Sequence, residues 1–339
     1  MSELDIVIPA SLQSYADGTF YETVRNFAQR TLSDFVNTMP DAQLYSRYND
    51  APATHAVVYR PDEFDSKHAV FVLNPFGNGH EPHMDIRHRL MQAVATPHAQ
   101  VVAFPNNTAQ KRYYSLTQQD LAIVAEGDAT PLAESIHATA EEMGLESIYL
   151  ITYSQGTFVG TALLRLAQQR GVIQIDKALI AEPTNVIDRT PAELKRAFMK
   201  TGLSPLIQAV RDSGIPALTE AQAMRGPRDW LRLGRGLLGV HSGSKIPENN
   251  ALHAGMTHRN ITRIMGEILA KDFAIDGSHS LRTAITVARA EKSKVTPANS
   301  IYKILTAYAR DSVEIEGYGH EAADNISGVF ALLSKMALR

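Results

Sequence analysis

The sequence places a serine at the corner between a short apolar run and a helical pattern. Ser154 stands in the stretch TYSQG (152–156), directly after a β-branched run. A tight strand-to-helix turn would lift this hydroxyl above the carboxyl ends of the strands, and Gly156 lets the helix begin close by. The following N–H groups would face an oxyanion formed at the serine. On this pentapeptide alone, such a serine is more often a helix N-cap than a nucleophile.

Two further motifs, together with the serine turn, carry a resemblance to a known family. The run VFVLNPFGNGH (70–80) is a strand pattern followed by a turn, and VEIEGYGHEAADN (313–325) is a strand pattern that leads through Gly-Tyr-Gly-His into a helix. In this order and context the three motifs resemble those of the α/β-hydrolase family. The resemblance implies that family's fold, a serine nucleophile and a helical cap.

The resemblance also implies a role for each motif residue. Ser154 is the expected nucleophile and His320 the expected catalytic base. The backbone N–H groups of Phe76 and Gln155 are the expected oxyanion hole. The dipeptide before Phe76 is Asn-Pro where the family has His-Gly, but the required donor belongs to Phe76 and is kept. The residues expected near the substrate are Asn74, His80, Tyr153 and Trp230.

The third member of the triad is not where the family pattern places it. Alignment through VARAEKSKVTP (287–297) puts Ser293 at the position of the family's aspartate. Glu291, two residues earlier on the same turn, is the expected acid. Glu182, at the end of an earlier strand, is the alternative, since related enzymes also supply the acid from that position. A histidine without an orienting acid typically loses orders of magnitude in rate.

The elements that must position these residues follow an α/β pattern. Helical patterns follow several apolar strands, and one of them, 131–144, is closed by Gly144. Near-continuous apolar strands alternating with helices indicate a mostly parallel central sheet covered by helices on both faces, as in the α/β-hydrolase fold. Strand patterns lie at 54–60, 68–79, 99–107, 148–151, 177–183, 283–290 and 312–319.

A helical region interrupts this alternation. From about Thr184 to about Ser280 the sequence shows helical segments separated by Gly and Pro. We interpret residues 184–279 as a helical cap or lid inserted into a core domain made of 54–183 and 280–339. Residues 1–53 are interpreted as an N-terminal extension packed on that core.

Histidines near the second strand raise the question of a metal site. His80, His83 and His88 lie close to Glu81 and Asp85. They offer no histidine pair at i, i+4 with a third ligand, which zinc sites on helices favour. A polar loop and first helical turn explain them, so no metal and no cofactor is expected. The neighbouring turn also lacks the Gly-Lys-Ser/Thr ending of a phosphate loop.

Four arginines surround the single tryptophan. Arg225, Arg228, Arg232 and Arg235 recur at helical spacing around Trp230. This pattern is typical of a solvated helix face beside an apolar stripe. The alternative is a cap surface that selects an anionic substrate or a partner.

The composition narrows the function classes. Lys and Arg number 33 against 36 Asp and Glu, a net charge of -3, which argues against a chain-wide affinity for nucleic acid. Cysteine is absent, so disulfides and thiolate sites are excluded. The start lacks a signal-peptide pattern and no long apolar run is present, so we expect a cytoplasmic protein without a membrane span. Homo-oligomer formation is left open.

These patterns lead to two hypotheses about function. The first is a serine hydrolase that acts on a small-molecule carboxylic ester or related acyl bond through a Ser-His-acid triad and an acyl-enzyme. The same constellation serves acyl transfer or cleavage of a carbon-carbon bond. The alternative is a catalytically weakened protein of this fold with a binding or structural role, for which Ser293 in place of the acid and the altered oxyanion entrance at Asn74-Pro75 are the arguments.

Overall fold

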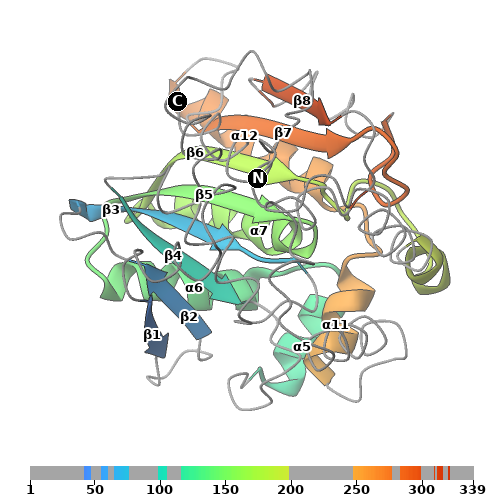
Figure 1. Cartoon of the computed structure of the whole chain (residues 1–339), viewed down its shortest axis with the longest axis horizontal. Coiled ribbons are helices and arrows are strands. Elements are labelled where there is room, and N and C mark those ends of the chain that lie inside the picture. Colours follow the sequence, from blue (N-terminus) through green and yellow to red (C-terminus); the bar gives the residue numbers. More distant parts are fainter. Residues whose placement is uncertain are drawn as a thin grey trace, which may run out of the picture.

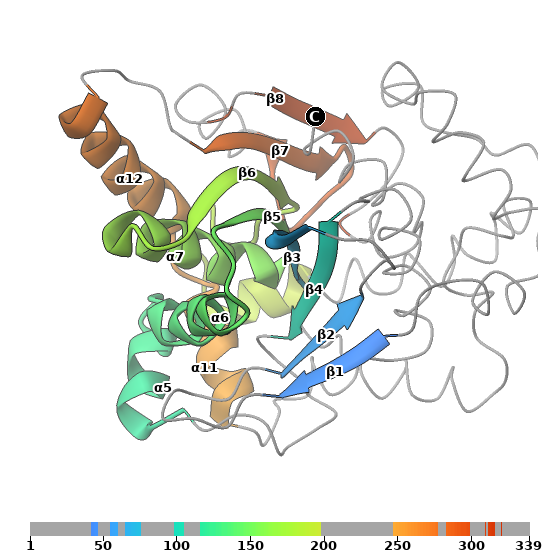
Figure 2. The same cartoon turned by 90° about the vertical axis from the view of Figure 1, so that its left-hand side faces the viewer.

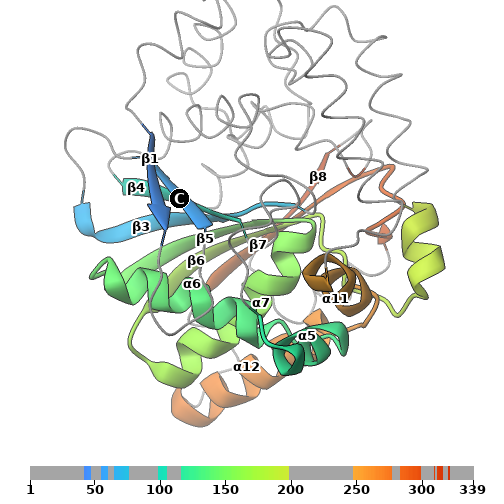
Figure 3. The same ribbon diagram turned by 90° about the horizontal axis from the view of Figure 1, so that it is seen from below.

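One eight-stranded sheet forms the centre of the described chain (Figure 1). Helices of the described chain lie against one of its faces (Figure 3). The computed structural model describes residues 42–46, 55–59, 65–75, 98–104, 116–197, 247–276, 283–298, 309, 311–315 and 320.

The sheet is mostly parallel. Its spatial order is β1-β2-β4-β3-β5-β6-β7-β8, in which β1 and β2 pair antiparallel with their neighbours and all other pairs are parallel. The predicted fold class is thereby confirmed, and β5 lies centrally between β3 and β6. The strands are β1 (Ala42–Ser46), β2 (His55–Tyr59), β3 (Asp65–Leu73), β4 (His98–Phe104), β5 (Ser147–Tyr153), β6 (Gln174–Ala181), β7 (Ala284–Ala290) and β8 (Asp311–Ile315).

Burial along β3 explains why its sequence is apolar without alternation. Successive side chains of a strand point to opposite faces of the sheet. Val70 and Val72 on one face and Phe71 and Leu73 on the other are all fully buried. Both faces of the sheet centre are therefore covered, as expected for parallel strands that read as continuous apolar runs.

The described helices pack together on one side of the sheet. Figures 2 and 3 show α6, α7 and α12 along this side, with α5 and α11 beside each other at its end. None of the described helices is both long and apolar enough to span a bilayer. The helices are α5 (Gln118–Ala125), α6 (Thr130–Glu142), α7 (Gln155–Arg170), α11 (Pro247–Gly255) and α12 (Ile261–Asp276), and residues 191–197 are helical as well.

Helix α7 begins at the serine corner and is the most deeply buried of these helices. Phe158, Val159 and Leu163 are buried in the core that it forms with the sheet and with α12. The helix ends at Gly171, whose left-handed φ of 65° lets its N–H reach back to the carbonyl of Ala167. Buried packing at this helix fixes the direction in which its first turn points.

Two segments of the described chain do not fit the predicted domain boundaries. Strand β1 falls within the predicted N-terminal extension 1–53, yet it is a strand of the sheet, paired with β2. Helices α11 and α12 fall within the predicted cap 184–279, yet they pack into the core, and Gln168 of α7 donates a hydrogen bond to the carbonyl of Ile268. Residues 198–246 of the predicted cap lie outside the described residues.

Helix α6 buries a histidine without a hydrogen bond. His137 is 1% exposed, and neither ring nitrogen has a hydrogen-bond partner among the described residues. The carboxylate of Glu141 lies 3.4 Å from Nδ1, close enough to attract a charged ring. Burial nevertheless lowers the pKa of His137, with the charge of Arg170 acting in the same direction and that of Glu141 opposing both. The folded protein therefore favours the neutral ring.

This histidine is expected to make the fold sensitive to acid. Because its pKa is lower folded than unfolded, where it is about 6.5, its contribution to stability is complete above that pH and falls as pH drops below it. The loss is at most about 1.4 kcal/mol per pH unit. Urea unfolding at pH 5.5 and 7.5 should show a smaller pH difference for His137→Leu than for the wild type. Replacing the exposed His258 by Gln should leave the difference unchanged, and an unchanged difference in His137→Leu would contradict the assignment.

Candidate active site

Ser154 sits on a strained turn between β5 and α7. Its backbone has φ 52° and ψ -115°, a conformation that costs a non-glycine residue about 1–3 kcal/mol. Within the described ranges, only one other non-glycine residue, Glu182, has a positive φ. The side chain of Ser154 is 2% exposed. Such strain persists only where the surrounding structure enforces it, and it often accompanies a functional site.

Close packing at Gly156 enforces this turn. A Cβ atom at this position would lie 2.1 Å from the carbonyl oxygen of Leu73 and 3.1 Å from that of Asn74. The first turn of α7 therefore rests directly on the end of β3, which only glycine permits. At the other side of the turn, Thr152 packs against α7. Its methyl group fills the space that a Cβ on Gly160 would occupy.

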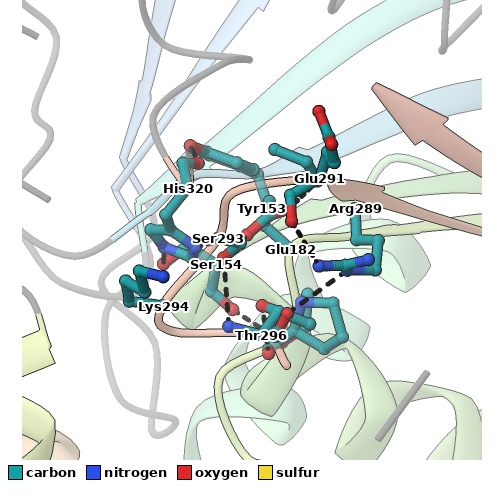
Figure 4. Close-up of polar contacts among 12 residues, drawn as sticks. Tyr153, Ser154, Glu182, Arg289, Glu291, Ser293, Lys294, Thr296 and His320 are labelled. Carbon is teal, nitrogen blue, oxygen red and sulfur yellow. Dashed lines mark hydrogen bonds and ion pairs between the residues drawn. The ribbon is translucent and has the colours of Figure 1, made fainter. Parts of the chain in front are cut away.

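His320 lies within hydrogen-bond distance of the serine. Its Nε2 is 2.8 Å from Ser154 Oγ, and its side chain is also buried (Figure 4). The two residues are 166 positions apart in the sequence, so the sheet brings them together. If Nε2 carries no proton it can accept the serine proton, which requires the proton of the neutral ring to be on Nδ1.

The carboxylate that meets Nδ1 belongs to Glu182. Its Oε2 lies 2.6 Å from His320 Nδ1. Glu182 directly follows β6, and strand register pairs Tyr153 with Ala181, so the residues after these two strands are neighbours at the carboxyl edge. A left-handed φ of 51° turns the chain at Glu182. The carboxylate is buried, and its Oε1 accepts a hydrogen bond from the backbone N–H of Ala290.

Glu291, the acid preferred from the sequence, is placed differently. It is exposed, and Figure 4 shows its carboxylate directed away from the ring of His320. Its backbone is fixed at the end of β7, where its N–H donates to the carbonyl of Ile315 and its carbonyl accepts from Arg289. The structure thus places Glu182, the alternative, beside His320, with its carboxylate 2.6 Å from Nδ1.

Ser293 stands where the family pattern has the acid, and in the structure it contacts the carboxylate of Glu182. Its Oγ lies 2.6 Å from Glu182 Oε2, and its own oxygen accepts the N–H of Thr296 at 3.1 Å. Arg289 holds this turn in place through hydrogen bonds to the carbonyls of Glu291 and Thr296 (Figure 4). The sequence alignment identified this serine only as a missing acid, and the contact with the carboxylate went unforeseen.

Tyr153 was predicted to lie near the substrate. In the structure it contacts His320. It is 1% exposed, and its hydroxyl donates a hydrogen bond to the backbone carbonyl of His320. Its ring is stacked against that of His320, with centroids 5.8 Å apart and planes inclined by 21°. The residue before the serine therefore ties the histidine to the central strand.

The first turn of α7 supplies backbone donors beside Ser154. Gln155 is the first residue of the helix, and the opening N–H groups of a helix have no acceptor within it. The N–H of Thr157 is already used, since it donates to the carbonyl of Ser154 at 3.0 Å. The positive end of the helix dipole adds to the attraction for a negative oxygen at this corner.

Of the remaining predicted site residues, Asn74 alone lies in the part of the chain that the structure describes. It lies buried at the end of β3 beside Gly156. In the described part of the chain no three His, Asp or Glu side chains gather as metal ligands would. The predicted site and surface residues outside the described part are Phe76, His80, Glu81, His83, Asp85, His88, Arg225, Arg228, Trp230, Arg232 and Arg235.

Comparison with known proteins finds similarity in structure only. No protein-family profile and no curated protein matches the sequence. An alpha/beta hydrolase enzyme from a Medee basin deep-sea metagenome library superposes with a TM-score of 0.54 at 12% identity, covering 87% of this chain and 97% of that chain. A 2-hydroxy-6-oxo-6-phenylhexa-2,4-dienoate hydrolase from Rhodococcus sp. strain RHA1 gives 0.54 at 14% identity, with 88% and 100% covered. A deformylase from Pseudomonas putida S16 gives 0.52 at 16% identity, with 88% and 100% covered.

Proposed function

The chain has the α/β-hydrolase fold, and we propose that it is a serine hydrolase with Ser154 as nucleophile, His320 as general base and Glu182 as the acid. The observation that carries this proposal is the continuous chain of contacts from Ser154 Oγ to His320 Nε2 at 2.8 Å and from Nδ1 to Glu182 at 2.6 Å. The hydrolase activities named for the similar structures support it. The substrate class is a carboxylic ester or a related acyl bond.

The first half of the reaction forms an acyl-enzyme. Ser154 Oγ attacks the carbonyl carbon while its proton passes to His320 Nε2. Glu182 holds the Nδ1 proton and stabilises the imidazolium that results. The N–H of Gln155 and, by resemblance, that of Phe76 bind the oxygen that becomes negative. The tetrahedral adduct then collapses, and the leaving alcohol takes the proton from Nε2.

The second half returns the enzyme to its starting state. Water attacks the acyl carbon and gives its proton to His320 Nε2, and a second tetrahedral adduct forms in the same oxyanion site. Its collapse releases the carboxylic acid and returns the proton to Ser154 Oγ. Every group in this cycle except Phe76 belongs to the described residues, and residues 198–246 are proposed to form the cap that selects the acyl chain.

The position of Glu182 argues against the alternative function. A binding or structural role was suggested in part because Ser293 stands where the family's acid is expected. A carboxylate at 2.6 Å from Nδ1 supplies the orienting group that such a role would not need. The positive φ angles of Ser154 and Glu182 agree with a functional site at this corner of the sheet.

Covalent labelling tests the proposal without knowledge of the substrate. Purified protein is treated with alkyl fluorophosphonates of increasing chain length, and the adduct is located by peptide mass spectrometry. We expect one adduct per chain on Ser154. It should be lost in His320→Ala and kept in His258→Ala, which changes an exposed histidine. A folded protein that no member of the series labels, or an adduct on another residue, would refute the assignment.

A further inference from the structure

We propose that Ser293 is a positioning residue whose hydroxyl holds Glu182 in the orientation that His320 requires. This inference rests on the proposed function, since it assigns the group that makes the relocated acid effective. Ser293, in the turn after β7, is then part of the proposed active site although it supplies no carboxylate.

The contacts of one carboxylate oxygen carry the inference. Glu182 Oε2 has two close neighbours, His320 Nδ1 at 2.6 Å and Ser293 Oγ at 2.6 Å. All three side chains are at least nine-tenths buried, so water does not replace a lost partner at low cost. A hydrogen bond to an ionised acceptor in such a place is stronger than one between neutral groups.

The hydroxyl of Ser293 is itself aimed at the carboxylate. Its oxygen accepts the backbone N–H of Thr296 at 3.1 Å, so its own proton is the one left for Glu182. The N–H of Ser293 donates to the carbonyl of Ala290 at 3.0 Å, which closes a tight turn. The hydroxyl of Thr296 donates instead to the backbone carbonyl of Pro183, at 2.9 Å.

A glutamate needs this support more than an aspartate would. Its longer side chain has one additional rotatable bond, so more freedom must be removed to fix the carboxylate. The N–H of Ala290 fixes Oε1, and Ser293 fixes Oε2. Without the hydroxyl, the histidine would be the one partner of Oε2 left among the described residues, and the carboxylate that orients the ring would depend on the ring for its own orientation.

Kinetics with a matched control test this role. We expect Ser293→Ala to lower kcat for an aryl ester and the rate of fluorophosphonate labelling on the order of 10-fold, with KM nearly unchanged. Ser293→Thr, which keeps the hydroxyl, should recover most of the rate. Thr296→Val removes a neighbouring buried hydroxyl that binds Pro183 and not the carboxylate, and it should stay within about twofold of the wild type.

Proton NMR provides a readout that does not depend on turnover. A ring proton shared between His320 Nδ1 and Glu182 gives a signal far downfield, which His320→Ala identifies by its loss. We expect this signal in the wild type, in Thr296→Val and in Ser293→Thr, and its broadening or loss in Ser293→Ala. If Ser293→Ala fails to fold, Ser293→Cys, a similar shape with a weak donor, replaces it in both measurements.

The two proposals fail in different ways. An unchanged labelling rate and an unchanged downfield signal in Ser293→Ala would overturn the role of Ser293 and leave the hydrolase assignment intact. Loss of rate in Thr296→Val equal to that in Ser293→Ala would also overturn it, because the turn and not the hydroxyl would then matter. A wild type without any labelling would refute the hydrolase, while the NMR comparison would still decide whether Ser293 holds Glu182.

Discussion

Replacing Ser154 by alanine is expected to lower ester turnover by about 10⁴-fold or more while the fold is kept. The change removes one oxygen and leaves the backbone in the same strained conformation, so the sheet and α7 have no reason to rearrange. Turnover of an aryl ester and far-UV circular dichroism measure the two parts of this expectation. The residual rate should match that of the oxyanion site acting alone.

A second buried serine on the same strand provides the control. Ser147 opens β5 at the end opposite the site, and its hydroxyl has no hydrogen-bond partner in the described chain. Ser147→Ala should retain wild-type turnover. If Ser154→Ala kept more than about a tenth of the activity, the nucleophile would have to be another residue.

Replacing Glu182 by glutamine should reduce kcat by about 10³–10⁴-fold. An amide in this place can turn its NH₂ group towards His320 Nδ1, which favours the ring tautomer that cannot accept the serine proton. The same substitution at the exposed Glu291 should leave kcat within about twofold, since its carboxylate points away from the histidine. Steady-state kinetics of the two variants side by side make the comparison.

This pair separates the two acids considered from the sequence. A large loss in Glu291→Gln with full activity in Glu182→Gln would return the role to the turn after β7. Equal and small effects in both would mean that the histidine is oriented by other contacts, such as the hydrogen bond from Tyr153 to its backbone carbonyl.

The sequence predicted the parallel sheet because its central strands are buried on both faces and read as continuous apolar runs. It did not predict β1, whose five residues AQLYS pair only with β2 at the outer side of the sheet. It also placed α11 and α12 in the cap, since a helix that covers a sheet and a helix that covers a pocket have the same apolar periodicity. Only packing distinguishes them.

The site was predictable where a residue is fixed by local turn chemistry. Ser154 lies on a strand-to-helix corner that the pattern SQG marks, and the strained φ of 52° follows from that corner. The acid depends instead on which strand ends lie side by side. Spatial order puts β6 between β5 and β7, so Glu182 is next to both Ser154 and the turn that carries Ser293. Alignment with the family pattern favoured Glu291, which lies on the same turn as the expected acid, and gave Glu182 only as the alternative.

Tyr153 was one of the residues expected near the substrate. Alternation along β5 explains its actual position, since neighbouring side chains of a strand point to opposite faces. A buried aromatic ring with a hydroxyl needs an acceptor, and the carbonyl of His320 meets that need. For a tyrosine at the buried end of a strand, the more useful prediction is therefore a hydrogen bond from its hydroxyl to a nearby acceptor.

The contact between Tyr153 and His320 has a consequence for the heat resistance of activity. His320 follows β8, which is the outermost strand at its end of the described sheet, whereas Ser154 and Glu182 follow interior strands. Outer strands open more easily than interior ones, so local unfolding there would remove the base while the rest of the domain stays folded. The tyrosine hydroxyl attaches the histidine directly to β5, and this opening must therefore break a buried hydrogen bond at the centre of the sheet. We therefore expect loss of activity on heating and global unfolding to occur in one cooperative transition.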